Sequence, residues 1–175
     1  GSQSKIDEFK TFQTTSTFGV WGDELIQNGE FSTTVDRSLI EEVTDGDFPN
    51  NTTAWSLNNA VIINNEAKIE IDSAGSMASV SQPISFTEGK EYKVTFDAKG
   101  TAANNIRLQS NPSTGAGGLT NANALFQPTT SYQTYSFTWI ANASCNHISF
   151  ERNDFTQTNW DFYIDNVSVH EVITQ

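Results

Sequence analysis

The chain has 175 residues, which is enough for one domain with a buried core and a short extension. Nine basic residues against 21 acidic ones give a net charge of −12. This charge argues against nucleic acid and anionic membranes as partners, because both bind basic surfaces. The sequence contains no run of 18 apolar residues, so it predicts no membrane-spanning helix.

Residues 1–37 are polar and weakly patterned, and we expect them to form an extension that precedes a domain at 38–175. Gly1-Ser2 is typical of residues left by cloning, and the apolar residues from Ile6 to Phe12 recur at a spacing that suits one short helix. Residues 25–31 (LIQNGEF) resemble residues 42–48 (EVTDGDF). The earlier copy is therefore either an extra strand or the start of a truncated repeat.

From residue 53 onward, apolar and polar residues alternate, as in Tyr92, Val94 and Phe96 with polar residues between them. Such alternation is typical of antiparallel strands with one buried face. The pattern predicts an all-β, antiparallel two-sheet β-sandwich. Pro83 cannot donate a ladder hydrogen bond and should lie at an edge or a bulge. The expected strands are 53–57, 60–64, 67–72, 77–84, 91–99, 105–110, 132–140, 146–152 and 161–172.

The last expected strand changes its alternation part-way along. Phe162 and Ile164 share one face, whereas Val167 and Val169 fall on the opposite parity. A β-bulge near Asp165-Asn166 would return all four apolar side chains to one buried face, because a bulge shifts the alternation by one residue.

Two signatures bracket the expected domain. The first is Asp45-Gly46-Asp47-Phe48 with Trp55 downstream, and the second is the closing stretch 162–169, FYIDNVSV. In this order they resemble the jelly-roll carbohydrate-binding modules of families 4, 9, 16 and 22, which are galactose-binding-like β-sandwiches. The resemblance implies a jelly roll and a non-catalytic role in binding a polysaccharide or oligosaccharide. No nucleophile, zinc or phosphate-loop motif of a known enzyme class is present, so we expect no enzyme.

In the resembled modules a structural calcium ion ties the first strand to the last one. The carboxylates that match are Asp47 in the opening signature and Asp165 in the closing one. Carboxylate oxygens are the ligands that Ca²⁺ prefers. The alternative is that both side chains only cap turns by accepting backbone hydrogen bonds.

A sugar site needs an aromatic ring for the apolar face of the sugar and polar side chains for its hydroxyl rim. Side chains opposite the expected core face, together with a tryptophan in a polar loop, meet this need. Trp55 and Trp139 are better explained as core residues. The alternative is a polar outer face with no ligand. The expected ligand-binding residues are Arg107, Gln109, Glu151, Trp160 and Tyr163.

Two functions remain open from the sequence. The first is a module that holds a secreted polysaccharide-degrading enzyme on its substrate. The second is a structural or adhesive module of a phage tail or a cell-surface protein, which the partial repeat at residues 25–31 would suit. Both imply a secreted, extracellular or virion-surface location, and they differ in the oligomeric state that they predict.

Overall fold

The structure is a computed structural model that describes residues 40–110 and 124–173, together with the backbone of residues 26–27 and 30–31. Every regular element in these ranges is a β-strand, which confirms the predicted all-β fold. No helix in the described part of the chain is long and apolar enough to cross a membrane. The expected short helix near Ile6 and most of the loop 110–124 fall outside the described residues.

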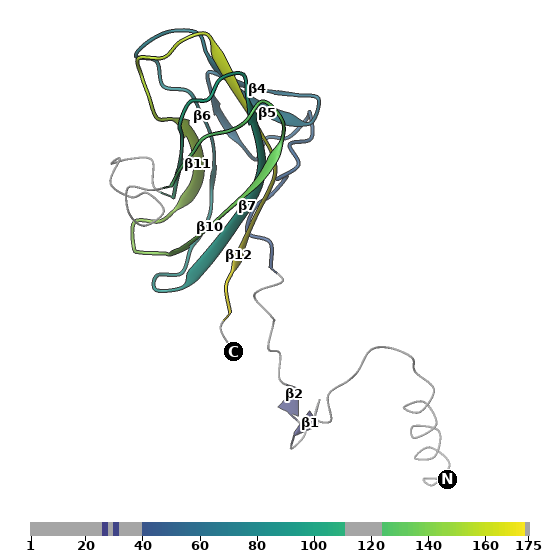
Figure 1. Ribbon diagram of the computed structural model, residues 1–175. Coiled ribbons are helices and arrows are strands. Elements are labelled where there is room, and N and C mark those ends of the chain that lie inside the picture. The colour runs from purple at the N-terminus through teal and green to yellow at the C-terminus, as the bar shows by residue number, and fades with distance from the viewer. Residues whose placement is uncertain (1–25, 28–29, 32–39, 111–123, 174–175) are drawn as a thin grey trace, which may run out of the picture. The chain divides into compact units, whose positions relative to one another are not determined.

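Two five-stranded antiparallel sheets pack face to face in the unit formed by residues 36–175, which confirms the predicted sandwich. In Figure 1, β6 and β11 face β7, β10 and β12 across the sandwich. The first sheet has the order β10 (Gln133–Ile140), β7 (Glu91–Gly100), β12 (Trp160–Glu171), β5 (Glu66–Ile71) and β4 (Ala60–Ile63). The second has the order β3 (Ser56–Asn58), β6 (Ser79–Pro83), β11 (His147–Arg152), β8 (Ile106–Gln109) and β9 (Leu125–Phe126).

The core forms where the alternating apolar side chains of both sheets meet. Phe96 of the first sheet and Phe150 of the second are fully buried, and their ring centroids lie 4.8 Å apart. Trp55 and Trp139 are also buried, which confirms that they are core residues. Each expected strand overlaps an observed one, and the strand of the two sheets that the sequence did not predict is the two-residue β9.

A bulge interrupts β12 where the sequence predicts one. The pairing of β12 with β7 shifts register between Asp165 and Ser168, and Asn166 adopts a positive φ of 51°. Asparagine tolerates this left-handed conformation better than most residues. Val167 is nearly buried and Val169 is fully buried, so the bulge returns both side chains to the core face.

The opening signature lies directly against β12. The amide of Val167 donates to the carbonyl of Gly46 at 2.8 Å, and the amide of Glu42 donates to the carbonyl of Val169 at 2.9 Å. A Cβ atom on Gly46 would stand 1.9 Å from the Val167 carbonyl oxygen, so only glycine fits this approach. Phe48 is fully buried. The two signatures that bracket the domain in sequence are therefore neighbours in space.

Pro83 is the last residue of β6 and has a neighbouring strand on one side only. It lies opposite His147 of β11, whereas β3 pairs only with residues 79–81 on the other side of β6. No ladder partner is lost at this position, which confirms the prediction of an edge site for the proline.

Residues 1–35 form a separate unit. Its described backbone consists of β1 (Ile26–Gln27) and β2 (Glu30–Phe31), which pair antiparallel with Ile26 opposite Phe31. These strands fall in the earlier copy of the repeated signature. The assignment of residues 1–37 as an extension stays a prediction.

Candidate functional site

The structure divides the five predicted ligand-binding residues between the two sheets. Arg107, Gln109 and Glu151 lie on β8 and β11 of the second sheet, whereas Trp160 and Tyr163 lie on β12 of the first. These residues therefore do not form one continuous site.

Three of them, with Ser149, form a polar cluster on the outer face of the second sheet. Arg107 lies opposite Glu151 and Gln109 lies opposite Ser149, and all four share the face that their parity predicts. Glu151 accepts hydrogen bonds from Gln109 Nε2 at 2.9 Å and from Ser149 Oγ at 3.0 Å. Arg107 instead donates to Asn153 Oδ1 at 2.8 Å. Because Gln109 is only 2% exposed and Glu151 only 6%, this outer polar cluster offers little surface to a polymer.

Burial dominates the electrostatics of the outer polar cluster. Burial raises the pKa of the Glu151 carboxyl, while the Ser149 hydrogen bond and the charge of Arg107 oppose that rise. Burial also lowers the pKa of nearby His147 on the same strand. Gln109 Oε1 is a buried acceptor without a hydrogen-bond partner among the described residues. A role for this cluster in ligand binding stays a prediction.

The prediction that Trp160 lies in a loop and offers a stacking surface is wrong. Trp160 is the first residue of β12, lies opposite Ile71 and is 3% exposed. Its ring centroid is 5.6 Å from that of Phe162. Because β12 begins one residue before the expected strand, Trp160 shares the core-facing parity of Phe162 and Ile164. No face of its ring is free for a sugar.

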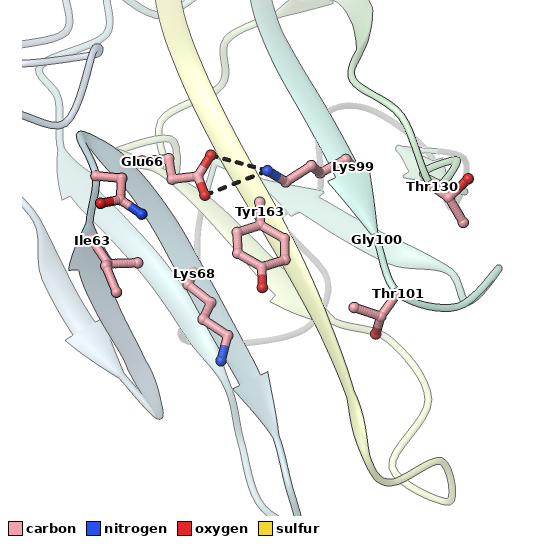
Figure 2. A pocket seen from close by; sticks show the side chains of 9 residues that line it. Ile63, Glu66, Lys68, Lys99, Gly100, Thr101, Thr130 and Tyr163 are labelled. Atoms are coloured by element: carbon pink, nitrogen blue, oxygen red, sulfur yellow. Dashed lines mark hydrogen bonds and ion pairs between the residues drawn. The ribbon is translucent and has the colours of Figure 1, made fainter.

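Tyr163 points to the opposite side of the same strand and lies in a pocket on the outer face of the first sheet. The pocket has a volume of about 680 Å³, within the range of small-molecule sites. Figure 2 shows the ring of Tyr163 near its centre, between Lys68 and Ile63 on one side and Thr101 on the other. We call this the Tyr163 pocket. Its lining residues are Ile63, Asn64, Glu66, Lys68, Lys99, Gly100, Thr101, Thr130 and Tyr163.

Strand register places two lysines on either side of the tyrosine. Tyr163 of β12 lies opposite Lys99 of β7 and, on its other side, opposite Lys68 of β5. Side chains directly opposite one another in antiparallel strands point to the same face. A lysine therefore lies on the same face as Tyr163 on each side of β12.

Lys99 is held in place by an acid and two aromatic rings. Its ammonium lies 3.2 Å from Glu66 Oε2, 4.5 Å from the centre of the Tyr163 ring and 4.4 Å from that of Tyr132. Tyr132 in turn donates its hydroxyl to Glu66. Burial, reinforced by this bond to the carboxylate, raises the pKa of Tyr132 above its usual value, so the phenol stays a donor. Cation–π contacts and the ion pair fix the side of the pocket formed by Lys99.

Lys68 is similarly neutralised on the other side. Its ammonium lies 2.9 Å from Glu70 Oε1 and 3.2 Å from Asp161 Oδ2. The hydrogen bond to Glu70, followed by that to Asp161, raises the pKa of Lys68 despite the opposing effect of desolvation. Thr101 accepts a hydrogen bond from the Asp161 amide at 2.8 Å, which anchors the rim next to this pair. The pocket thus presents a tyrosine ring, charge-paired ammonium groups and hydroxyls.

The sequence analysis did not select Lys99, Glu66 or Tyr132 as site residues. The alternation in β7 could have identified Lys99 as an outward-facing residue, because Lys99 shares the parity of Lys93 and Asp97. Tyr132 precedes β10 in a turn, and nothing in its local pattern shows that it reaches Glu66 of β5.

The two predicted calcium ligands lie close enough for their charges to interact. Burial is the largest cause of a raised pKa at Asp165, and the carboxylates of Glu66, Asp97 and Asp47 also raise it. Asp97 lies directly opposite Asp165, and its oxygens already accept hydrogen bonds from Thr134 and Asn166. No three His, Cys, Asp or Glu side chains within 40–110 and 124–173 form a group that could hold a metal ion. Asp47 and Asp165 alone would leave most of the six to eight oxygen ligands of Ca²⁺ to other groups.

Residues 24–170 match DUF642, a family described as proteins of unknown function. The chain belongs to the DUF642 family. The match begins within the stretch predicted to be an extension, so it includes the earlier copy of the repeated signature. No curated protein is significantly similar to this DUF642 chain.

Solved structures share the fold of this DUF642 chain at low sequence identity. A family 4 carbohydrate-binding module aligns with a TM-score of 0.59 and 13% identity over 68% of this chain and 95% of its own. The CBM22-1 xylan-binding domain from Paenibacillus barcinonensis aligns with a TM-score of 0.52 and 10% identity, over 78% and 95%. The enzymatically active domain of a tailspike protein from bacteriophage CBA120 aligns with a TM-score of 0.53 and 15% identity; the match covers 76% of this chain but only 22% of that one.

These likenesses confirm the fold that the resemblance to carbohydrate-binding modules implied. The assignment to a type shared by families 4, 9, 16 and 22 stays a prediction, because the family that matches this chain is DUF642.

Proposed function

We propose that this DUF642 chain is a non-catalytic carbohydrate-binding module whose ligand lies in the Tyr163 pocket. The observation that carries the proposal is the exposed-side placement of Tyr163 in a pocket of about 680 Å³. Its fold, shared with carbohydrate-binding modules of known structure, supports the same function.

The chemistry of the pocket suits a sugar ring. Tyr163 provides an aromatic face for the C–H side of the ring, and Ile63 adds apolar surface at the rim. Each lysine ammonium has three donors, and the hydroxyls of Thr101 and Thr130 can both donate and accept. These groups can form hydrogen bonds with sugar hydroxyls, and such binding would not change the net charge of the pocket. Glu66, the carboxylate that lines the pocket, already forms an ion pair with Lys99, which favours binding over acid–base catalysis.

We predict that Tyr163→Ala lowers glycan affinity at least about thirtyfold, because a central aromatic anchor typically contributes about 2 kcal/mol or more. Tyr163 is the aromatic residue among those that line the pocket. Tyr163→Phe keeps the ring and should retain most of the binding. Affinity gel electrophoresis against soluble neutral polysaccharides measures the change.

Two controls locate the binding site. Phe155→Ala removes an exposed ring in the loop before β12 and should leave binding unchanged. Gln109→Ala alters the outer polar cluster. If Gln109→Ala abolishes binding and Tyr163→Ala does not, the ligand lies on the second sheet and the proposed site is wrong.

We propose that the module acts outside the cell, where it holds a polysaccharide-degrading enzyme on its substrate. The alternative is a structural or adhesive module of a phage tail or cell surface. The fold shared with part of a phage tailspike and the repeated signature at residues 25–31 favour that alternative. Light scattering coupled to size exclusion separates the two: a monomer with glycan affinity supports the first, and a stable oligomer without it supports the second.

We further propose that calcium binds between the opening signature and β12, with Asp47 and Asp165 as side-chain ligands. The mutual repulsion of carboxylates around Asp165 supports the proposal, because a cation would relieve it. Calcium at a hundredfold excess over its Kd would stabilise the fold by about 2.7 kcal/mol. Chelation should therefore lower the melting temperature of the wild type but not of Asp165→Ala. An unchanged wild-type melting temperature, with no metal in elemental analysis, would exclude the site.

A further inference from the structure

We infer that the Tyr163 pocket selects uncharged glycans and rejects those that carry carboxylate or sulfate groups. The inference rests on the proposed function and adds the class of ligand. It follows from how the register of three strands arranges charge around the tyrosine.

Charged side chains form three parallel rows on the outer face of the first sheet. The middle row is Lys99, Tyr163 and Lys68, across β7, β12 and β5. On one side of it, Asp161 of β12 lies opposite Glu70 of β5. On the other side, Asp97 of β7 lies opposite Asp165 of β12, and Glu66 lies at the start of β5. A cationic row therefore runs between two anionic rows.

The anionic rows outnumber the cations. Glu66 neutralises Lys99, and Glu70 and Asp161 together more than neutralise Lys68. A further carboxylate, that of Asp97, lies opposite Asp165 in the outer row. Even without Asp47 and Asp165, whose charges a calcium ion would neutralise, the two ammonium groups of Lys68 and Lys99 stand against four carboxylates, those of Glu66, Glu70, Asp161 and Asp97.

This balance decides what the lysines can bind. An anionic sugar would have to compete with carboxylates that already contact both ammonium groups, and it would face an excess of like charge, which costs several kcal/mol at close range. A neutral hydroxyl needs only a spare N–H donor, and each ammonium keeps one beyond its ion pairs. The paired lysines thus act as hydrogen-bond donors with little net positive charge.

The test compares two panels of soluble polysaccharides on affinity gels at low salt. The neutral panel is xylan, mannan and β-glucan, and the anionic panel is polygalacturonate and carrageenan. We expect the wild type to bind a member of the neutral panel at least about tenfold more tightly than either anionic polymer, a difference of about 1.4 kcal/mol.

A charge variant tests the cause. Glu70→Gln combined with Asp161→Asn removes both carboxylates from Lys68 and should raise affinity for the anionic panel at least about tenfold, a gain that salt should reverse. The matched control, Glu88→Gln with Glu91→Gln, makes the same change in net charge. Glu91 begins β7, whereas Lys99 lies near its end, so this control should gain nothing. Melting temperatures establish that each variant is folded, and the single variant Glu70→Gln replaces the double one if that unfolds.

The outcomes separate the two proposals. Wild-type binding to anionic polymers as tight as to neutral ones overturns the selectivity and leaves carbohydrate binding standing. No gain of anionic binding in the folded charge variant overturns the electrostatic cause. Binding to neither panel overturns the proposed function and the selectivity with it.

Discussion

Replacing Arg152 by alanine is expected to lower the free energy of unfolding by about 3 kcal/mol or more, because four partly buried backbone carbonyls would lose a charged donor. Arg152 ends β11 and is 1% exposed. Its Nη1 donates to the carbonyls of Ser73 and Ser76, both at 2.8 Å. Its Nη2 donates to the carbonyls of Asp154 at 2.9 Å and Gln157 at 2.6 Å. One guanidinium therefore joins the loop before β6 to the loop before β12.

Urea denaturation of two further variants separates this role from general effects of charge. Arg152→Lys keeps the charge but has a single ammonium in place of a planar fork, so we expect it to recover only part of the lost stability. Arg107→Ala removes a half-buried arginine with one side-chain acceptor, Asn153, and should cost much less. A loss below about 1 kcal/mol in Arg152→Ala would show that water replaces the arginine at these carbonyls.

Trp160→Ala is expected to destabilise the fold by about 3–5 kcal/mol, the usual cost of truncating a large buried aromatic side chain. The ring is buried and packs against Phe162 between the sheets. Its Nε1 is a buried donor without a partner among the described residues. Trp160→Phe should therefore cost clearly less, because it leaves a smaller cavity and removes no hydrogen bond.

Thermal unfolding and glycan binding, measured on the same samples, test this assignment. Below their melting temperatures, both Trp160 variants should bind glycans like the wild type. Phe155→Ala, whose ring is 37% exposed, controls for the loss of an aromatic side chain near the same loop and should shift the melting temperature little. A stable Trp160→Ala variant that no longer binds would restore Trp160 as a ligand-binding residue.

Features that repeat along one strand were predictable from the sequence. The alternation in β7 and β10 identifies a sheet with one buried face, and the change of parity after Ile164 identifies the bulge in β12. Both depend on the two-residue period of a single strand, and the amino-acid sequence of that strand is enough to show this period. The same period also places Trp160 on the core face, because Trp160 lies two residues before Phe162. That residue was misplaced because the strand was expected to begin one position later.

Features that join different strands were not predictable in this way. The Tyr163 pocket depends on β12 lying between β5 and β7, and the contact of Tyr132 with Glu66 joins residues 66 positions apart. Arg152 likewise bonds a carbonyl 79 residues away. A strand's own sequence states which side chains share a face, but not which strand lies beside it or in what register.

The sequence by itself therefore determined the all-β sandwich, the burial of Trp55 and Trp139, and the bulge in β12. Only the tertiary structure decided that Tyr163 lies between two paired lysines and that Arg107, Gln109 and Glu151 lie on the other sheet. The physical reason is that burial and charge pairing are properties of neighbours across strands, and those neighbours are set by strand order and register.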